Sequence, residues 1–487
     1  MKTAIFSLPQ NRIPEIVKAS AMATCLAMGI LWATHALEMK WLVAIVAALS
    51  LLGFAVATGR FERFLLNFFF FIIPFNADFN WHSSEGGGGV LELGVSTLDI
   101  MMVFLYGAWI LRLVSRRDPQ PGPALSATLP LVLLIVWSAL SILNAREPQL
   151  TLFAVVGLLK TLLYFFYFAY NIKTREDLWL IVRCVALGLV AESVFTFLQY
   201  AAGGYLGLAA LGERPIPKEL ELSESKMVRV GGTLGHPNQL GGYLSAVLPL
   251  LFAVNGAKLR RATRILVILA IGLGMITLVL TFSRSAWLAT ALAFFAILGW
   301  LILEGKKRLR LGPVLTALAV LGVIFLFFKP LIIARFTGDD EGSVTSRIAQ
   351  MRVARSMITQ HPILGVGLNN YDAVKHLNES FVENSMERGK VNRVHNIFLL
   401  IAAETGLVGL GFFLWFLCVL AVLGWKKIAS IQDESVHLIF LGLYLCFFAR
   451  LLHDATHTAY LSTSPLFWIY SALLVSKRKW GSVSESA

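Results

Sequence analysis

The sequence predicts an all-α, polytopic membrane protein with about 12–14 transmembrane helices and a long, partly helical loop on one side of the membrane. Hydrophobic residues make up 57% of the 487 residues, against roughly 45–50% in soluble domains. The excess lies in blocks of about 18–22 residues, the length that a helix needs to cross ~30 Å of hydrocarbon. The net charge of +13 comes from basic residues that gather in every second connection between these blocks, as a topology signal would.

Fourteen apolar blocks are candidate spans. They are residues 14–35, 40–58, 62–77, 97–114, 125–143, 150–171, 177–201, 238–255, 263–281, 285–303, 312–333, 396–422, 435–452 and 463–476. The third block is short and rich in Phe, with Pro74 near its end, so it is either a full span, a half-span or an interfacial helix. No internal repeat indicates a duplicated transporter fold.

The basic clusters orient the chain. They are Arg60/Arg63, Arg112/Arg116/Arg117, Lys173/Arg175, Lys258/Arg260/Arg261/Arg264, Lys306/Lys307/Arg308/Arg310, Lys426/Lys427 and Lys477/Arg478/Lys479. Because Lys and Arg collect in cytoplasmic loops, both termini are expected in the cytoplasm and the long loops outside. The expected organisation is N-terminal helices (1–201), an outer loop (202–237), core helices (238–333), a large outer loop (334–395) and C-terminal helices (396–487).

Several classes of protein and site are disfavoured by composition. All four cysteines fall in apolar blocks, where they are expected to pack as small hydrophobic residues rather than form disulfides or bind metal: Cys25, Cys184, Cys418 and Cys446. No soluble stretch gathers basic residues, so nucleic acid is not an expected partner. The N-terminal segment is broken by Pro9 and has no cleavage pattern, so we do not expect a signal peptide.

The loop 334–395 contains a predicted helix. Ser343 or Thr345 can cap it and Pro362 ends it. Its expected apolar face consists of Ile348, Met351, Ala354 and Ile358, and it carries Arg347, Arg352 and Arg355.

Polar residues gather where the spans meet the outer side. They are Arg229, His236, Asn238, Ser283, Arg284, Arg347, Arg393, His395, Asn396, Arg450, His453, Asp454 and His457. Helix-end arginines often extend to lipid headgroups. Arg284 fits that interpretation poorly, because it lies in a short turn on the side that is depleted of arginine. Asn238 follows Pro237 and can equally act only as a helix cap.

Glu404 is a carboxyl group within a predicted span, about 13 Å deeper than His395 along the helix. Such a residue either faces a functional cavity or joins two helices. It lies half a turn away from His395 on the helical wheel, so we do not expect the two side chains to touch.

The segment His453-Asp454-Ala455-Thr456-His457 places two histidines on one helix face, as in zinc proteases with an H-E-x-x-H motif. Asp is shorter than the Glu of that motif, and no third ligand follows. We therefore favour a polar helix end that lines the same outer cavity, with no metal, and keep an intramembrane metalloprotease as an alternative.

Together these residues predict a membrane enzyme with its site on the outer side. Several arginines suit a diphosphate, because guanidinium binds phosphate oxygens through paired hydrogen bonds. A histidine kept neutral by neighbouring arginines can remove a proton from a hydroxyl group. A lipid-linked diphosphate donor attacked by an alcohol needs both features.

Three stretches carry a resemblance to a known family: TFSRSAWLA (281–289), SRIAQMRVARSMITQHPILGVGLNNY (346–371) and VHNIFLLIAAETGLVGLGFF (394–413). The chain resembles the O-antigen ligase and Wzy-type polymerase superfamily of bacterial inner-membrane proteins over residues 229–425. The resemblance implies periplasmic, inverting glycosyl transfer from an undecaprenyl-diphosphate-linked glycan to a sugar hydroxyl, with no cofactor and no metal. The implied partners are this donor, an acceptor glycan or lipid A-core, the lipid bilayer and, as further candidates, other polysaccharide-assembly proteins.

Residue by residue, the resemblance makes His395 the base that activates the acceptor, and Arg284 and Arg347 the ligands of the diphosphate. Arg229, with the following GHPN, matches a polymerase-like motif at the donor or glycan entrance. Supporting roles are expected for His236, Asn238, Arg393, Asn396 and Glu404.

Ligases, polymerases and a branch that glycosylates proteins share these motifs, so the three activities stay open, with a lean toward exopolysaccharide polymerases. The competing class is a transporter or flippase of lipid-linked glycan. Its main support is Lys160, a charge in the middle of a span.

Overall fold

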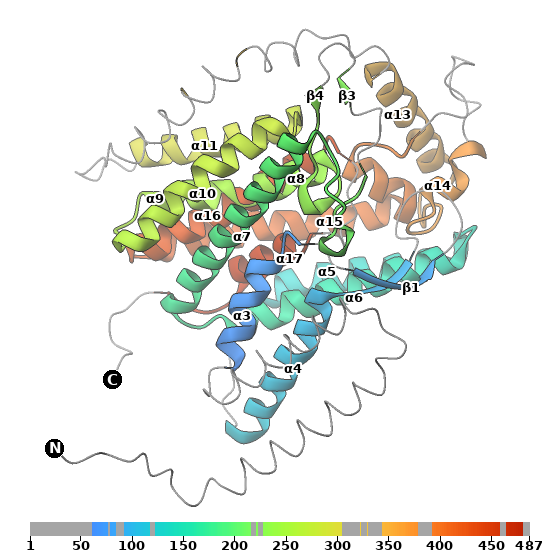
Figure 1. Ribbon diagram of the computed structural model, residues 1–487. Helices are drawn as coiled ribbons and strands as arrows, with labels where there is room; N and C mark the ends of the chain where they lie inside the picture. The colour runs from blue at the N-terminus through green and yellow to red at the C-terminus, as the bar shows by residue number, and fades with distance from the viewer. Residues whose placement is uncertain are drawn as a thin grey trace, which may run out of the picture. The chain divides into compact units, whose positions relative to one another are not determined.

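The computed structural model describes residues 61–75, 78–83, 92–116, 122–215, 221–222, 227–303, 322, 329, 343–377, 392–457 and 464–480 (Figure 1). The expected spans 14–35 and 40–58, and nearly all of 312–333, lie outside these residues. The chain divides into two units, Met1–Leu65 and Leu66–Ala487, and the second contains every element discussed below except the first residues of α3.

The described residues are predominantly helical, which confirms the predicted fold class. The helices are α3 (Phe61–Ile72), α4 (Thr97–Arg116), α5 (Leu125–Leu140), α6 (Pro148–Asn171), α7 (Arg175–Ala202), α8 (Pro237–Ser245), α9 (Leu248–Asn255), α10 (Arg261–Leu280), α11 (Arg284–Leu303), α13 (Ser343–Gln360), α14 (Tyr371–Val374), α15 (Ile397–Ser430), α16 (Glu434–Asp454) and α17 (Pro465–Val475). Two short antiparallel pairs join β1 (Asp78–Ser83) to β2 (Glu92–Ser96), and β3 (Glu221–Leu222) to β4 (Met227–Val228).

In the part of the chain that is described, seven helical segments are long and apolar enough to cross a membrane: α4, α5 with the turn after it, α6, α7, α10, α15 and α16. The chain is therefore a multi-pass membrane protein. Helix α3 runs for 12 described residues, or about 18 Å at 1.5 Å per residue, which is shorter than a bilayer core of ~30 Å. That length agrees with the half-span alternative.

The predicted span 238–255 is two helices, because the chain breaks at Ala246–Val247 between α8 and α9. The cause is Pro249, which has no N–H to donate to Ser245 and whose ring would clash with that carbonyl group. Prediction from hydropathy alone does not detect this break, since both halves are apolar.

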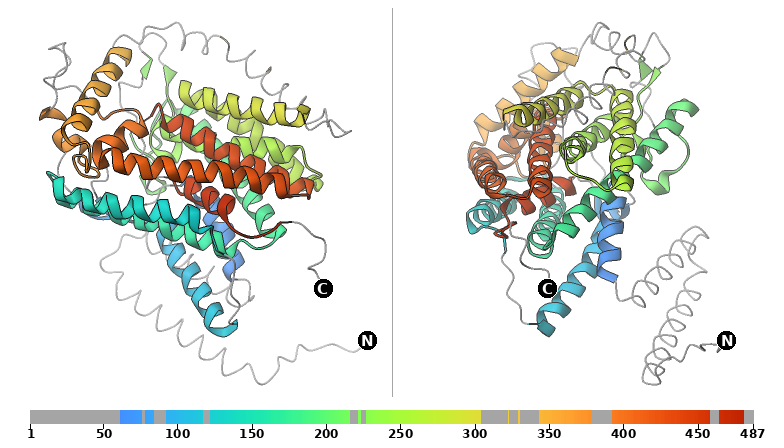
Figure 2. Two further views of the ribbon diagram at one scale, coloured as in Figure 1. Left: turned by 180° about the vertical axis from the view of Figure 1, so that it is seen from behind. Right: turned by 90° about the vertical axis from the view of Figure 1, so that its left-hand side faces the viewer.

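The helices of the second unit pack in pairs that are distant in sequence. Helix α16 lies against α9, α10 against α7, α15 against α5, and α17 against α6. Figure 2 shows α5, α6 and α15 running side by side. The buried interior is rich in aromatic rings, with Phe416 stacked on Trp468 and in edge contact with Phe165.

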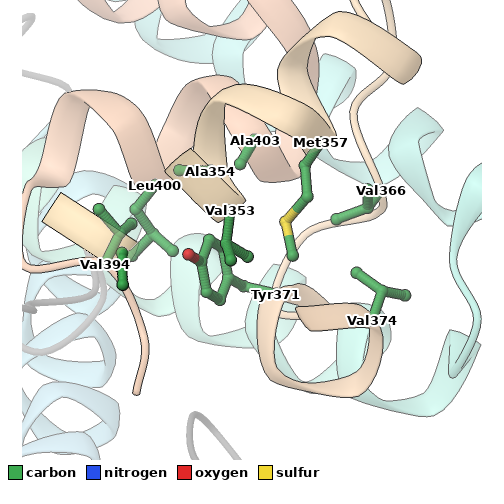
Figure 3. Close-up of a cluster of buried hydrophobic side chains, with 10 residues drawn as sticks. Val353, Ala354, Met357, Val366, Tyr371, Val374, Val394, Leu400 and Ala403 are labelled. Atoms are coloured by element: carbon green, nitrogen blue, oxygen red, sulfur yellow. The ribbon is translucent and has the colours of Figure 1, made fainter. Parts of the chain in front are cut away.

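Helix α13 ends before Pro362 as predicted, but its predicted apolar face is only partly right. Ile348 and Met351 are 45% and 46% exposed, whereas Val353 and Met357 are fully buried. The helix turns this side inward because Tyr371 occupies the centre of a buried cluster with them (Figure 3). The cluster contains Ala349, Val353, Ala354, Met357, Val366, Tyr371, Val374, Val394, Leu400 and Ala403.

Helix α15 is interrupted at Gly406, whose φ of 73° and ψ of 178° are not helical. The segment after α13 fills the break. Leu407 donates its N–H to the carbonyl of Pro362 (2.8 Å), and Val366 donates to the carbonyl of Ala403 (2.9 Å). The indole N–H of Trp137 reaches the Thr405 carbonyl at 3.0 Å. These bonds pair backbone groups that a broken helix within a membrane cannot leave unpaired.

Replacing Gly406 with Ala should destabilise this junction. The residue has a positive φ, and a Cβ there would collide with the carbonyl of Ile363, so we expect a loss of about 2 kcal/mol or more. Thermal unfolding of the purified protein in detergent measures the effect as a lower midpoint.

The matched control is Gly411→Ala in the same helix, where a Cβ meets nothing within 4 Å. It should leave the midpoint unchanged or raise it slightly, because Ala favours helix by about 1 kcal/mol over Gly. Equal midpoints for both variants would contradict the role of the break.

Candidate functional site

Four histidines from three segments meet at the start of α15: His236 before α8, His395 before α15, and His453 and His457 at the end of α16. The ring of His457 contacts the other three, with centroid separations of 5.8 Å to His395, 6.0 Å to His236 and 5.3 Å to His453. We call this set the histidine cluster. The sequence prediction that the end of α16 lies with the other polar helix ends is confirmed by these contacts.

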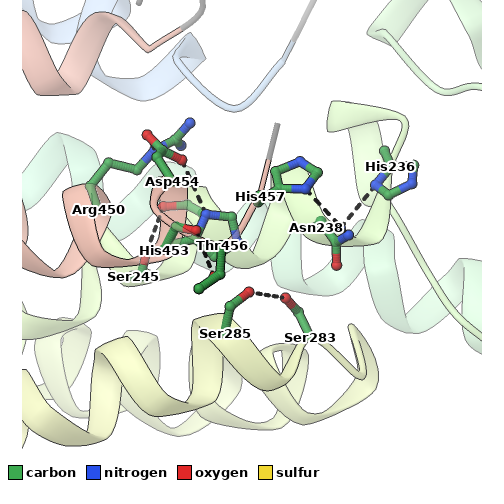
Figure 4. A network of polar contacts seen from close by, with 11 residues as sticks. His236, Asn238, Ser245, Ser283, Ser285, Arg450, His453, Asp454, Thr456 and His457 are labelled. Atoms are coloured by element: carbon green, nitrogen blue, oxygen red, sulfur yellow. Dashed lines mark hydrogen bonds and ion pairs between the residues drawn. The ribbon is translucent and has the colours of Figure 1, made fainter. Parts of the chain in front are cut away.

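His236 is the N-cap of α8, and its Nδ1 accepts the Asn238 N–H at 3.1 Å. Asn238 is therefore not the cap. Its side chain instead bridges two groups: Oδ1 accepts from an Arg229 Nη2 at 3.0 Å, and the amide nitrogen lies 3.5 Å from His457 Nδ1 (Figure 4). Arg229 also donates from Nε to the carbonyl of Thr281 at 3.0 Å.

The segment that precedes His236 is held by α7. Glu192, which is fully buried, accepts the Thr233 N–H at 3.0 Å and the Thr233 hydroxyl at 2.6 Å. About two turns further along the same helix, Gln199 Oε1 accepts the Gly232 N–H at 2.8 Å. Two polar side chains of α7 thus hold the backbone segment that precedes and positions His236.

The end of α16 is a buried network. Asp454 accepts from Arg450 Nε at 2.8 Å through one oxygen and faces His453 Nδ1 at 3.2 Å through the other. Helix α8 approaches this network closely at Gly242, where a Cβ would lie 2.8 Å from Arg450 Nη1 and 3.1 Å from His453 Cε1. The Arg–Asp–His network is therefore packed directly on α8.

His395 is placed by its neighbours in the chain. Asn396 caps α15, since its Oδ1 accepts the Leu399 N–H at 3.0 Å. Arg393 forms an ion pair with Asp372, the second residue of α14. The supporting residues Asn396 and Arg393 thus hold the backbone on both sides of His395.

Burial and nearby positive charges keep three histidine rings of the cluster unprotonated. Burial, with Arg347 and Arg393 nearby, lowers the pKa of His395 below its ordinary value of 6.5. Burial, with Arg229 and His395, lowers the pKa of His236 to about 4. Burial and the surrounding histidines and Arg450 lower the pKa of His457 well below 6.5. The three rings are therefore uncharged at pH 7 and can accept protons.

Arg284 is the first residue of α11 and is half-buried. The turn before it has Phe282 at a φ of 52°. Ser283 in this turn packs against Gly241 of α8, where a Cβ would lie 3.1 Å from the serine Cβ. The structure thus brings the Arg284 turn against the helix that carries Asn238. Arg347 on α13 is exposed and lies within electrostatic reach of His395.

Glu404 lies apart from the histidine cluster. Its side chain is 1% exposed, and its carboxylate accepts the backbone N–H groups of Tyr371, at 3.3 Å, and of Asn369. Its own carbonyl accepts from Gly367 at 3.0 Å. Glu404 therefore anchors the segment after α13 to α15, which agrees with the structural alternative and with the expectation that it does not touch His395.

Sequence reasoning favoured His453 and His457 as a polar helix end that lines the outer cavity, and kept a metal site as the alternative. Among the described residues, no group of three or more His, Cys, Asp and Glu side chains is arranged to hold a metal ion. The sequence did not predict that His457 contacts both His236 and His395. These contacts depend on the packing of α8 on α16. The signal for that packing is weak in sequence, since Gly241 and Gly242 are only a pair of small residues on α8.

Residues 265–414 match the sequence model of the family described as O-Antigen ligase. The chain carries an O-antigen ligase family domain. This match confirms the resemblance drawn from the sequence motifs, and it supports glycan transfer by a membrane ligase or polymerase in general. The matched residues include Arg284, Arg347 and His395, while His236 and His457 lie outside them on either side. No curated protein matches the chain.

The depressed pKa values predict a pH dependence of stability. A histidine with a folded pKa near 4 and an ordinary pKa of 6.5 binds fewer protons in the folded protein between those pH values. Stability is therefore retained above pH 6.5 and falls as the pH drops toward 4. His236→Asn should make this fall shallower while keeping the helix cap, because Asn is a good N-cap residue.

Unfolding midpoints of the wild type and His236→Asn between pH 4 and 7.5 measure this effect. The two curves should converge at neutral pH and separate on acidification, with the variant higher. Parallel curves would show that His236 is not kept neutral by the fold.

Proposed function

We propose that the protein is an inner-membrane glycosyltransferase that moves an undecaprenyl-diphosphate-linked glycan onto a sugar hydroxyl at the periplasmic face. The family domain supports glycan transfer in general. The observation that carries the specific proposal is His395, a ring kept neutral by burial and by Arg347 and Arg393 at the entry to a membrane span. The alternating basic clusters support an orientation with both termini in the cytoplasm.

In this proposal His395 removes the proton from the acceptor hydroxyl. The oxygen then attacks the anomeric carbon, and the bond between that carbon and the diphosphate oxygen breaks, with its electron pair leaving on the diphosphate. Attack from the side opposite the leaving group inverts the anomeric centre. A neutral imidazole suits this step because it is free to accept a proton at pH 7.

The diphosphate is assigned to Arg284 and Arg347, with a different role for Arg229. Arg284 opens α11, where the helix dipole favours an anion. Arg347 brings a second guanidinium close to His395 from α13. Two donor nitrogens of Arg229 are already bonded to Thr281 and Asn238, so Arg229 chiefly holds the segment that carries His236.

The transporter alternative loses its main support. Lys160 forms an ion pair with Asp99 at 2.8 Å, and its ammonium group also reaches the carbonyl of Gly94 at 2.5 Å. Tyr164 donates to the other Asp99 oxygen at 2.8 Å. The charge in the middle of α6 is thus neutralised in a contact between α6 and α4. An enzyme that acts as ligase, polymerase or protein glycosyltransferase remains the proposal.

His395→Ala should abolish transfer without loss of the folded protein, since the alanine keeps the cap at Asn396. The measurement is glycan analysis of a strain lacking the protein, complemented with wild type or variant. Accumulation of single lipid-linked repeats identifies a polymerase, and accumulation of long chains with bare lipid A-core identifies a ligase. His376→Ala, at a side-chain contact with Arg146, is the control. Full complementation by His395→Ala would remove His395 from the mechanism.

Arg284→Lys should reduce transfer about 10-fold to 100-fold. Lysine keeps the charge but loses the planar pair of donors that fits a phosphate, a loss of about 1.4–2.7 kcal/mol. Arg261→Lys is a matched control, because Arg261 is likewise the first residue of a helix, α10, and is exposed. Equal activity of the two variants would assign Arg284 to the headgroup region instead.

A further inference from the structure

The ring of His453 contains a nitrogen, Nε2, that can accept a proton and that the fold leaves unused. Its ring is fully buried, and within the described part of the chain no atom forms a hydrogen bond with its Nε2. A buried, unpaired ring nitrogen costs free energy in a fold, and it lies in a ring in contact with His457. The mechanism proposed above does not use it.

The tautomer of His453 follows from Asp454. The carboxylate cannot donate, so Nδ1 carries the proton that bridges them at 3.2 Å. Nε2 is then a bare lone pair. Arg450 holds the other carboxylate oxygen at 2.8 Å, which keeps the aspartate ionised and in place. A carboxylate that orients an imidazole and stabilises its charged form is the arrangement that makes a histidine a good proton acceptor.

The tautomer of His457 follows from Arg229. Because Arg229 donates to Asn238 Oδ1, the other terminal atom of Asn238 is the NH2 group, and it faces His457 Nδ1. Nδ1 is thus unprotonated and Nε2 carries the proton. The long separation of 3.5 Å leaves the Nδ1 lone pair only weakly held. His457 is therefore a donor at one nitrogen and an acceptor at the other, between His395 and His453.

We propose that His457 and His453, backed by Asp454, form a proton relay that takes over the proton removed by His395. This rests on the proposed function. The acceptor O–H gives its proton to His395, and the imidazolium passes a proton to His457 Nδ1. His457 releases its Nε2 proton to His453 Nε2, which becomes an imidazolium paired with Asp454. The proton then returns by the same rings to the diphosphate product, so no oxidant or reductant is needed.

The charges around the cluster favour this direction. The groups that face it are Arg229 before α8, Arg347 on α13, Arg393 before α15, and Arg450 and Asp454 on α16, together with His236. The charges acting on His395 are positive and oppose its protonation. His453 Nδ1 faces the Asp454 carboxylate at 3.2 Å. The Asp454 carboxylate therefore stabilises an imidazolium at His453, whereas Arg347 and Arg393 oppose one at His395.

The test uses His457→Gln and His453→Gln in the full chain, reconstituted in liposomes with lipid-linked glycan extracted from a strain lacking the protein. The initial transfer rate is measured from pH 6 to 9. We expect the kcat of each variant to fall about 10-fold to 100-fold at pH 7 with KM for the donor unchanged. The rate should then rise with pH, because hydroxide takes the proton that the relay no longer accepts. His437→Gln, the same change in the first half of α16, should behave as wild type.

A purely structural role predicts an equal loss at every pH or a change in KM, and either result would overturn the relay. Asp454→Asn is a second test of the relay, because it removes the negative charge while keeping the shape of the side chain. It should lower kcat and give the same rise of rate with pH. Unfolding midpoints identify variants that have simply lost the fold.

His395→Ala separates the two proposals. If it is inactive at every pH while His457→Gln and His453→Gln match wild type in rate and pH profile, the relay fails and the glycosyltransferase proposal stands. If His395→Ala is active, the proposed base itself is wrong.

Discussion

The break in α15 at Gly406 is the feature on which the site depends. An unbroken helix would offer no free backbone groups to the segment after α13, and a broken helix alone would leave them unpaired in an apolar environment. The segment pairs with the carbonyl of Ala403 and the N–H of Leu407, and Glu404 accepts its N–H groups from the side. The first two turns of α15 thereby become a platform that supports α13 and fixes the backbone next to His395.

Two charged side chains in the described helices are paired with an opposite charge. Lys160 pairs with Asp99, and Arg450 pairs with Asp454. What remains around the histidine cluster is a set of neutral rings beside exposed or half-buried arginines. This separation suits the proposed pairing of an anionic lipid-linked donor with a neutral base. In the proposed function, Arg347 both binds the diphosphate and lowers the pKa of His395, so one positive charge serves both parts of the mechanism.

Most of the membrane architecture could be predicted from the sequence, because apolar length and helix caps are local properties. The predicted span 435–452, which is α16 in the structure, and the end of α13 before Pro362 are examples. The inward face of α13 could not be predicted, because it is set by Tyr371, which lies in a different segment. At the candidate site, His395 and Arg284 were named from sequence motifs, and their roles stay predictions. The meeting of His457 with Asn238 across 219 residues follows only from helix packing.

The hold of α7 on the segment before α8 changes what counts as the functional unit. Glu192 and Gln199 belong to a helix outside the residues that match the family, yet they fix the backbone that delivers His236. The matched domain therefore does not contain all of the residues that position the candidate site. A hybrid that joined this domain to the N-terminal helices of a distant relative would keep Arg284, Arg347 and His395. It would lose the contacts of Glu192 and Gln199 that position the segment before His236. Diversification of substrate in such a protein is expected to proceed by co-ordinated change across both halves rather than by exchange of the domain.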